Sequence, residues 1–192
     1  QAGAAEGRQT SDSLLAAASS GASATEIVRY RVDRNAALSN DVLIYVAYCP
    51  GGRLSELQRR CIEGFAADGY EIVLVVNSGD FCHYVEPGSS PAVVQIVREN
   101  VGFDFGAWAH AVRLVGGLEA VQSVSFTNDS IIGPLGFDQA KSPRLSVDET
   151  PGDVVFMTEC HEVRPHGQSY FFTLKQSALR LGALDVIAAA ES

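Results

Sequence analysis

Two strand-like segments on either side of a helical segment constrain the fold of this chain most. Residues 42–48 (V-L-I-Y-V-A-Y) and 70–77 (Y-E-I-V-L-V-V-N) are rich in β-branched, aliphatic and aromatic side chains, which is typical of strands buried on both faces of a sheet. Residues 56–68 between them carry apolar side chains on one helical face, with Ser55 as the expected N-cap and Gly69 as the expected end. This order predicts parallel strands joined by a right-handed crossover.

The remaining patterns extend this unit into an α/β domain. We predict strands over residues 93–97, 121–126, 154–158 and 169–174, helices over 104–115 and from Gln176 onward, and loops over 78–91 and 133–152. Residues 27–33 fit either a short strand or the edge of a helix. Strands that alternate with helices in this way predict a three-layer sandwich around a mostly parallel central sheet.

Length and composition set the domain organisation. A chain of 192 residues suits one domain with a real core, and we assign that domain to residues 25–192. Residues 1–24 are rich in Ala, Ser and Gly, so we expect them to form a flexible arm. A helical pattern still runs at the last residues, and a C-terminally truncated domain is one interpretation of it.

Net charge limits the function classes. The value of −9 argues against a nucleic-acid partner, because a general nucleic-acid binder carries a basic face. Any phosphate site must then rely on a metal ion, on backbone N–H groups or on a few placed cationic side chains. The apolar runs are strand-sized, so no transmembrane helix is expected. The cationic side chains that could stabilise a leaving diphosphate are Arg98, Lys141, Arg144 and Arg164.

The first group of candidate site residues lies where the third strand is expected to pass into a helix. Ligands of parallel α/β sheets bind at the carboxyl ends of the strands. Asn100 and Gly102 lie in this loop, and the glycine permits close approach of a ligand to the backbone. Asp104 near the helix start could contact a sugar or a base of a donor. The alternative is that Asp104 is only a helix cap and that the glycines serve packing.

The second group follows the expected fourth strand, in the run T-N-D-S over residues 127–130. A divalent cation that bridges a diphosphate needs hard oxygen ligands, and Asp129 could supply one. Asn128 and Ser130 could hydrogen-bond a ribose or a phosphate. The alternative is a strand that ends in a turn, where Asn, Asp and Ser are common.

The third group follows the expected fifth strand. Glu159 or Glu162 could act as a general base toward an acceptor hydroxyl. His166 could ligate the metal or bind the leaving diphosphate, and we group Gln168 with it as a donor-binding residue. The alternative is a set of exposed loop carboxylates and a histidine that bonds local backbone groups. The order of the three groups along the chain favours a nucleotide-sugar site of the GT-A type.

Three motifs carry a resemblance to a known family. Residues 99–108 read E-N-V-G-F-D-F-G-A-W, residues 126–135 read F-T-N-D-S-I-I-G-P-L, and residues 165–172 read P-H-G-Q-S-Y-F-F. In these motifs the chain resembles the rhamnan-synthesis F-type proteins, over roughly residues 41–179. The resemblance implies a GT-A-like fold of the nucleotide-diphospho-sugar transferase, Rossmann-like type. It also implies a bacterial enzyme of cell-surface polysaccharide synthesis, such as that of cell wall or lipopolysaccharide.

The resemblance also implies a reaction and its participants. A sugar such as rhamnose would pass from a nucleotide-sugar donor to a glycan or a lipid-linked glycan, with Mn²⁺ or Mg²⁺ as cofactor. The location would be the cytoplasm, with peripheral association at the inner face of the membrane. In the more distant family-2 glycosyltransferases an Asp-x-Asp motif ends the corresponding strand; Asp129 matches its second Asp, but Thr127 replaces the first. The alternative is therefore a catalytically inactive glycan- or nucleotide-binding module of a larger protein.

Overall fold

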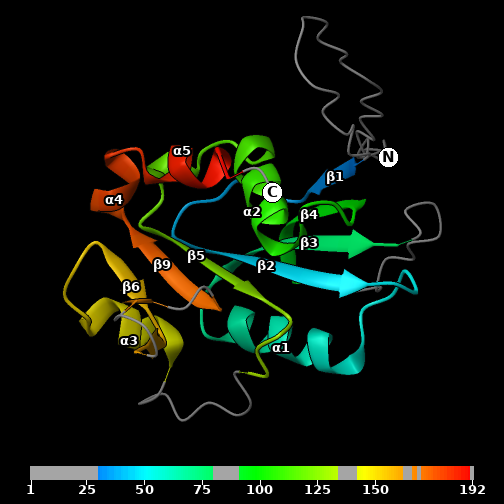
Figure 1. Ribbon diagram of the computed structural model, residues 1–192, viewed down its shortest axis with the longest axis horizontal. Helices are drawn as coiled ribbons and strands as arrows, with labels where there is room; N and C mark the ends of the chain where they lie inside the picture. Colours follow the sequence, from blue (N-terminus) through cyan, green and yellow to red (C-terminus); the bar gives the residue numbers. More distant parts are fainter. Residues whose placement is uncertain (1–29, 80–90, 134–141, 162–165, 168–169, 191–192) are drawn as a thin grey trace, which may run out of the picture.

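The computed structural model describes residues 30–79, 91–133, 142–161, 166–167 and 170–190, so the predicted arm over residues 1–24 lies outside the described residues. These residues form one seven-stranded sheet in the order β1-β4-β3-β2-β5-β9-β6 and a two-stranded ribbon, β7-β8 (Figure 1). The sheet strands are β1 (Tyr30–Arg34), β2 (Asp41–Cys49), β3 (Glu71–Ser78), β4 (Ala92–Glu99), β5 (Ser123–Asn128), β6 (Val154–Phe156) and β9 (Phe171–Lys175). The ribbon strands are β7 (Glu159–Cys160) and β8 (His166–Gly167).

The centre of the sheet is parallel and its edges are antiparallel. β4, β3, β2 and β5 pair in parallel, whereas β1 pairs with β4, and β9 with both β5 and β6, in antiparallel fashion. The prediction of a mostly parallel sheet therefore holds for the four central strands only. From β2 the chain moves outward to β3 and β4, and it then returns to the other side of β2 as β5. The sheet thus has a topological switch point between β2 and β5.

Helices cover both faces of the sheet, as predicted. α1 (Glu56–Ala67) and α3 (Pro143–Glu149) lie on one face, and α2 (Phe103–Leu114), α4 (Gln176–Arg180) and α5 (Ala183–Ala188) lie on the other (Figure 1). A short 3₁₀ helix, η2 (Leu118–Ala120), leads into β5. Trp108 of α2 is fully buried in the core on the second face. The three-layer arrangement removes both faces of the parallel strands from water, which is why those strands are apolar throughout.

Most of the predicted elements are confirmed, and the start of α1 shows why. Ser55 and Gln58 form a reciprocal capping box, in which each side chain accepts a hydrogen bond from the backbone N–H of the other. At the other end Gly69 takes φ +96°, a left-handed conformation that glycine adopts without a steric penalty. The helix therefore begins and ends where the sequence predicts.

Three predictions need correction. The loop expected over residues 133–152 contains α3, which begins with Ser142 as N-cap and Pro143 in the first turn. The C-terminal helical pattern is two helices, because Gly182 at φ +82° separates α4 from α5. The undecided segment near residue 30 is a strand from Tyr30 onward.

No helix in the described ranges has the length and apolar character needed to cross a membrane.

The aromatic packing around Phe172 gives a test of this core. Its ring lies 4.8 Å from Phe126, 5.6 Å from Trp108 and 5.8 Å from Phe156, measured between ring centroids. We expect Phe172→Ala to lower the free energy of unfolding by about 3–5 kcal/mol in urea titration, because it leaves a cavity between the sheet and α2.

The matched control is Val186→Ala, which shortens an apolar side chain that is 73% exposed. We expect it to change the free energy of unfolding by less than about 0.5 kcal/mol. Equal effects of the two substitutions would contradict the assignment of Phe172 to the core.

Candidate functional site

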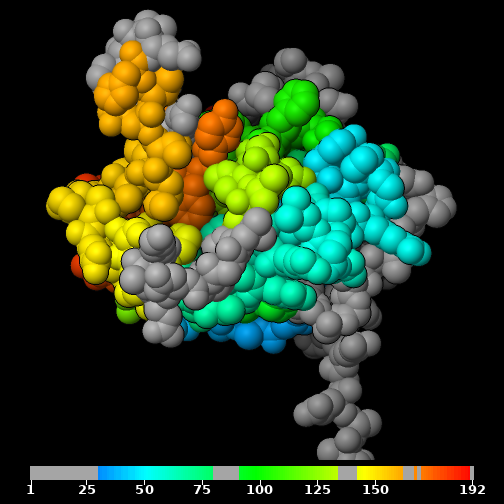
Figure 2. Space-filling view, turned by 90° about the horizontal axis from the view of Figure 1, so that it is seen from below, coloured from blue at the N-terminus to red at the C-terminus, as the bar shows by residue number. Residues whose placement is uncertain are grey.

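Three consecutive residues at the carboxyl end of β5 connect the strands and helices around the switch point. Thr127, Asn128 and Asp129 each bond a different segment of the chain: β9, α2 and the β2–α1 region respectively. The parallel strands β2, β3, β4 and β5 all end at this edge of the sheet. Figure 2 shows the yellow-green end of β5 surrounded by cyan, green and orange segments of the chain. This edge is where a ligand of such a sheet is expected.

Asp129 is held by two charge-assisted hydrogen bonds to one carboxylate oxygen. Its Oδ2 accepts from the backbone N–H of Tyr48 at 2.8 Å and from Nε2 of Gln58 at 2.7 Å. Its own N–H donates to the carbonyl of Val46 at 3.0 Å and so continues the pairing of β5 with β2. Within the described part of the chain no hydrogen bond reaches Oδ1. One oxygen therefore fixes the side chain, and the other is available to a ligand.

Asn128 joins Asp129 to the start of α2. Its Nδ2 donates to Oδ2 of Asp104 at 2.6 Å, and its Oδ1 accepts from the N–H of Ser130 at 3.1 Å. The N-cap of α2 is Gly102, at φ +74° and without a side-chain cap, so Asp104 in the first turn is not the cap residue. Asp104 thus faces the end of β5, and the cap alternative from the sequence is wrong.

Burial and a neighbouring negative charge both act on the carboxylate of Asp104. Burial raises the pKa of Asp104 above its ordinary value, the hydrogen bond from Asn128 opposes that rise, and the charge of Asp129 adds to it. No cationic side chain among the described residues forms an ion pair with Asp104 or Asp129. A cation beside these oxygens would be favoured because it would offset both burial and repulsion. The described ranges contain no group of three or more His, Cys, Asp or Glu residues that could hold a metal by themselves.

Thr127 has a structural role rather than a ligand role. It is fully buried, its Oγ1 donates to the carbonyl of Tyr170 at 2.9 Å, and its own carbonyl accepts from Nε1 of Trp108 at 3.3 Å. A side chain in this position cannot reach a ligand above the strand end. The residue at the first position of the strand-end motif therefore supports the sheet.

Arg98 supports the loop that carries Asn100 and Gly102. It is 2% exposed; its Nη1 donates to Oδ1 of Asn77 at 3.1 Å and its Nη2 to the carbonyl of Val101 at 2.7 Å. Burial, with a smaller contribution from the charge of Arg113, lowers the pKa of Arg98 to about 10. Arg98 therefore holds the loop through a buried contact and is not accessible to a diphosphate. Asn100, in contrast, is exposed.

Two residues of the third group, Glu159 and His166, lie on the β7–β8 ribbon, which was not predicted. Glu159 pairs in register with Gly167, and Cys160 with His166. The ribbon stands out from the body at the upper left of Figure 2. The side chain of Glu159 is 56% exposed and lies 3.4 Å from Nε2 of His161. No described contact joins the ribbon to Asp129; Glu162 and Gln168, like Lys141 and Arg164, lie outside the described residues.

A glycine fixes the base of this ribbon. A Cβ atom added at Gly167 would lie 2.2 Å from Cγ of Phe156, so only glycine fits against that ring. The backbone N–H of Met157 donates to the carbonyl of Phe171 at 3.1 Å and continues the pairing of β6 with β9. The ribbon is therefore attached to the sheet through β6.

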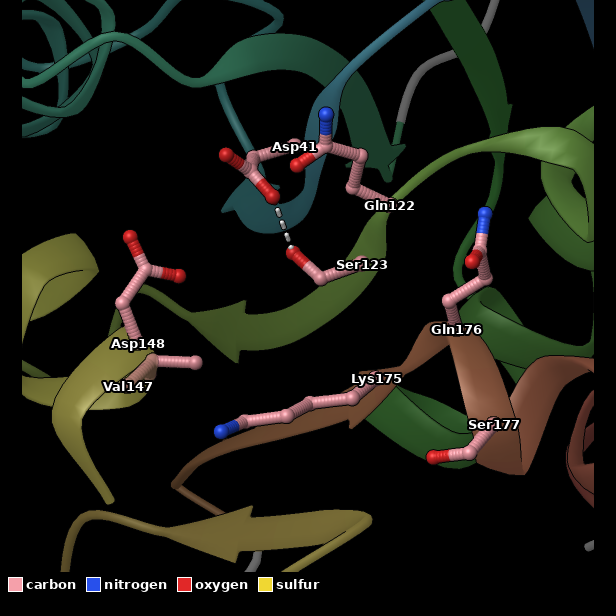
Figure 3. Close-up of a pocket in the computed structure, with 8 residues that line it drawn as sticks. All are labelled: Asp41, Gln122, Ser123, Val147, Asp148, Lys175, Gln176 and Ser177. Atoms are coloured by element: carbon pink, nitrogen blue, oxygen red, sulfur yellow. Dashed lines mark hydrogen bonds between the residues drawn. The ribbon is translucent and has the colours of Figure 1, made fainter. Parts of the chain in front are cut away.

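A polar pocket lies at the opposite end of the sheet from the candidate site. It has a volume of about 370 Å³ and includes Asp41, Ser123 and Lys175 in its lining (Figure 3). Asp41 accepts hydrogen bonds from Oγ of Ser123 at 2.7 Å and from Nε of Arg144 at 2.8 Å. Both carboxylate oxygens are thus used within the fold. Arg144, predicted as a diphosphate ligand, binds Asp41 instead and lies far from the carboxyl ends of the parallel strands.

Sequence comparison places these residues in a known family. The family model of rhamnan synthesis protein F matches residues 73–183, more than half of the chain. Two similar proteins, one from Vibrio anguillarum (strain ATCC 68554 / 775) and one from Vibrio anguillarum, are each described as virulence protein VirA. Each is 30% identical over 126 residues, which is 62% of this chain and 37% of the relative. The chain therefore matches little more than a third of their length. No solved structure matches the chain.

The raised pKa of Asp104 predicts a pH-dependent effect of Asp104→Asn. The unfolded chain gives up the Asp104 proton first, so the wild type loses stability as the pH rises from the ordinary aspartate pKa through the raised folded pKa. The amide oxygen of the variant can still accept from Asn128. We expect a higher melting temperature than wild type at pH 7.5, by a few degrees, and no difference below about pH 3.9.

Glu119→Gln is the control, because Glu119 is an exposed carboxylate on η2. We expect it to show no such pH-dependent gain in circular-dichroism melts. A variant Asp104→Asn that is less stable than wild type at pH 7.5 would show that its carboxylate stabilises the fold.

Proposed function

The chain belongs to the rhamnan synthesis protein F family, and from this premise we propose that it transfers a sugar from a nucleotide-sugar donor to a cell-surface polysaccharide. The observation that carries the proposal is the meeting of Asp104, Asn128 and Asp129 at the switch point of a parallel sheet. We propose that the fold of the chain is GT-A-like. Its support is the three-layer sandwich, the parallel centre of the sheet and the acidic end of β5.

The donor would bind through its diphosphate. The free oxygen of Asp129 and the carboxylate of Asp104 face this edge, and a diphosphate beside two carboxylates requires a cation between them. Mn²⁺ or Mg²⁺ fits, because such ions are commonly held by one or two protein carboxylates and completed by phosphate oxygens and water. Asn128, Ser130 and the loop at Asn100 and Gly102 would contact the ribose or the sugar.

The reaction would be a displacement at the anomeric carbon of the donor sugar. The acceptor oxygen forms a bond to that carbon as the bond to the diphosphate oxygen breaks, and the acceptor proton passes to a carboxylate base. The bound cation would supply charge stabilisation for the departing nucleoside diphosphate. Glu159 on the exposed ribbon and Glu162 stay the candidate bases.

A second function has its own support. The structural role of Thr127 and the exposed contact of Glu159 with His161 are also what a glycan- or nucleotide-binding module without turnover would show. Such a module would act within a larger protein, and the chain matches 37% of the length of its relatives. In either case we propose a glycan or lipid-linked glycan acceptor, with the protein in the cytoplasm at the inner face of the membrane.

The direct test is ligand binding by the wild type and Asp129→Asn. The asparagine oxygen can keep both hydrogen bonds that Oδ2 accepts, so the substitution removes the charge and the free oxygen but not the fold. We expect nucleoside diphosphates and nucleotide-sugars to raise the melting temperature of the wild type only with Mn²⁺ or Mg²⁺. A ligand at 100 times its dissociation constant stabilises by about 2.7 kcal/mol.

The variant should bind tenfold or more weakly, and Glu119→Gln should bind as the wild type does. A metal-dependent rise in melting temperature that persists in Asp129→Asn would show that the donor does not bind at the end of β5. Release of nucleoside diphosphate in the presence of acceptor separates the two functions: a transferase releases it, and a binding module does not.

A further inference from the structure

Exposed aromatic side chains surround the end of β5. Tyr48 is 48% exposed, Phe103 77%, Phe105 45% and Tyr170 47%. They come from three separate parts of the chain: β2, the first turn of α2 and the residue before β9. We call these four residues the aromatic rim. Apolar side chains that gather on one surface usually mark a binding site, whereas single exposed ones do not.

Hydrogen bonds attach each part of the rim to a different residue of the strand end. Thr127 bonds the carbonyl of Tyr170, and Asp129 bonds the N–H of Tyr48. Asn128 bonds Asp104, which stands between Phe103 and Phe105. The three segments that carry the rim therefore meet at the end of β5, and Figure 2 shows the corresponding orange, cyan and green segments around it.

The rim is held in place by the fold. The ring of Phe105 packs edge-on against Trp108, with 5.0 Å between the centroids. Phe103 takes φ +49° although it is not glycine, a conformation that is rare for a bulky residue. Neither the exposure of this ring nor its backbone conformation stabilises the protein by itself. A side chain kept exposed in a strained conformation indicates a role in binding.

The chemistry of the surface selects the occupant. A polar centre with an apolar border matches a sugar, whose hydroxyl edge is polar and whose C–H faces are apolar. A nucleobase covers one ring, whereas rings on three segments match a chain of several sugars. An anionic membrane surface is disfavoured as the occupant of the rim, because the net charge is −9 and because Asp104 and Asp129 lie at the strand end.

We propose that the aromatic rim binds the saccharide acceptor. Pyranose faces stack on Phe103, Tyr48 and Tyr170, and the polar hydroxyl edges of the sugars face the end of β5. The proposal rests on the proposed function only in calling this saccharide the acceptor; saccharide binding at the rim is an independent claim. A 6-deoxy sugar such as rhamnose fits well, because its methyl group enlarges the apolar surface.

The test is titration of the protein with α-linked rhamnose oligosaccharides of two to six units, followed by NMR chemical shifts and calorimetry without nucleotide. The variants are Phe103→Asn, Tyr170→Ser and the double variant. Asparagine tolerates the left-handed backbone at position 103, so folding should be preserved. The control is Leu181→Asn, since Leu181 is 83% exposed between α4 and α5.

We expect each single variant to bind the oligosaccharides tenfold or more weakly and the double variant to show no binding, whereas Leu181→Asn binds as the wild type does. Metal-dependent binding of nucleoside diphosphate should be unchanged in all of them. Three results would overturn the proposal: no oligosaccharide binding by the wild type, full binding by the double variant, or loss of nucleotide binding instead.

Loss of nucleotide binding in the rim variants would show that the rim binds the nucleobase. Binding of phospholipid vesicles that depends on the rim, in place of saccharide binding, would equally overturn the proposal. If nucleotides fail to bind but rhamnose oligosaccharides bind through the rim, the donor function fails and the saccharide site stands.

Discussion

The candidate site depends on the hydrogen bond from Gln58 to Asp129. The Oε1 atom of Gln58 accepts from Ser55 and so begins α1, while its Nε2 donates to Oδ2 of Asp129 at 2.7 Å and to the carbonyl of Tyr48 at 3.2 Å. One side chain therefore joins the start of a helix, the end of β2 and the end of β5. The backbone of β5 is already paired with β2 through the N–H of Asp129 and the carbonyl of Val46. The hydrogen bond from Gln58 therefore fixes the carboxylate of Asp129 rather than its backbone.

The fold could be predicted from the sequence wherever local patterns and burial agree. The central strands β2 and β3 are apolar on both faces because helices cover both, and their limits match the sequence patterns closely. The antiparallel edges were not predicted, because pairing direction depends on contacts between distant segments. α3 was missed because its few apolar side chains lie among polar residues, although Ser142 before Pro143 was a readable start signal.

The residues of the candidate site could be named from the sequence, but the contacts that hold them in place could not. Asn128 and Asp129 stand at a strand end, and the ligand rule for parallel sheets identifies them. The contact of Asp104 with Asn128 spans 24 positions and that of Gln58 with Asp129 spans 71, so no local pattern could reveal either. Thr127 looked like a lost ligand, but its hydroxyl bonds β9. The role of Glu159 stays a prediction. The ribbon that carries Glu159 is positioned by the close approach of Gly167 to Phe156, which no local sequence pattern reveals.

The carboxylates at the two ends of the sheet differ in how their charge is compensated. Asp41 at the amino end of β2 is buried, and Ser123 and Arg144 occupy both of its oxygens, so its charge is offset within the fold. Asp104 and Asp129 at the carboxyl end have no described cationic partner, and each retains one oxygen without a described hydrogen bond. Burial, with a smaller contribution from the charge of Asp129, raises the pKa of Asp104. An uncompensated pair of this kind costs stability, and a bound cation with its diphosphate would recover it. A polar pocket lies near Asp41, but the charge balance favours the carboxyl ends of the strands as the candidate site.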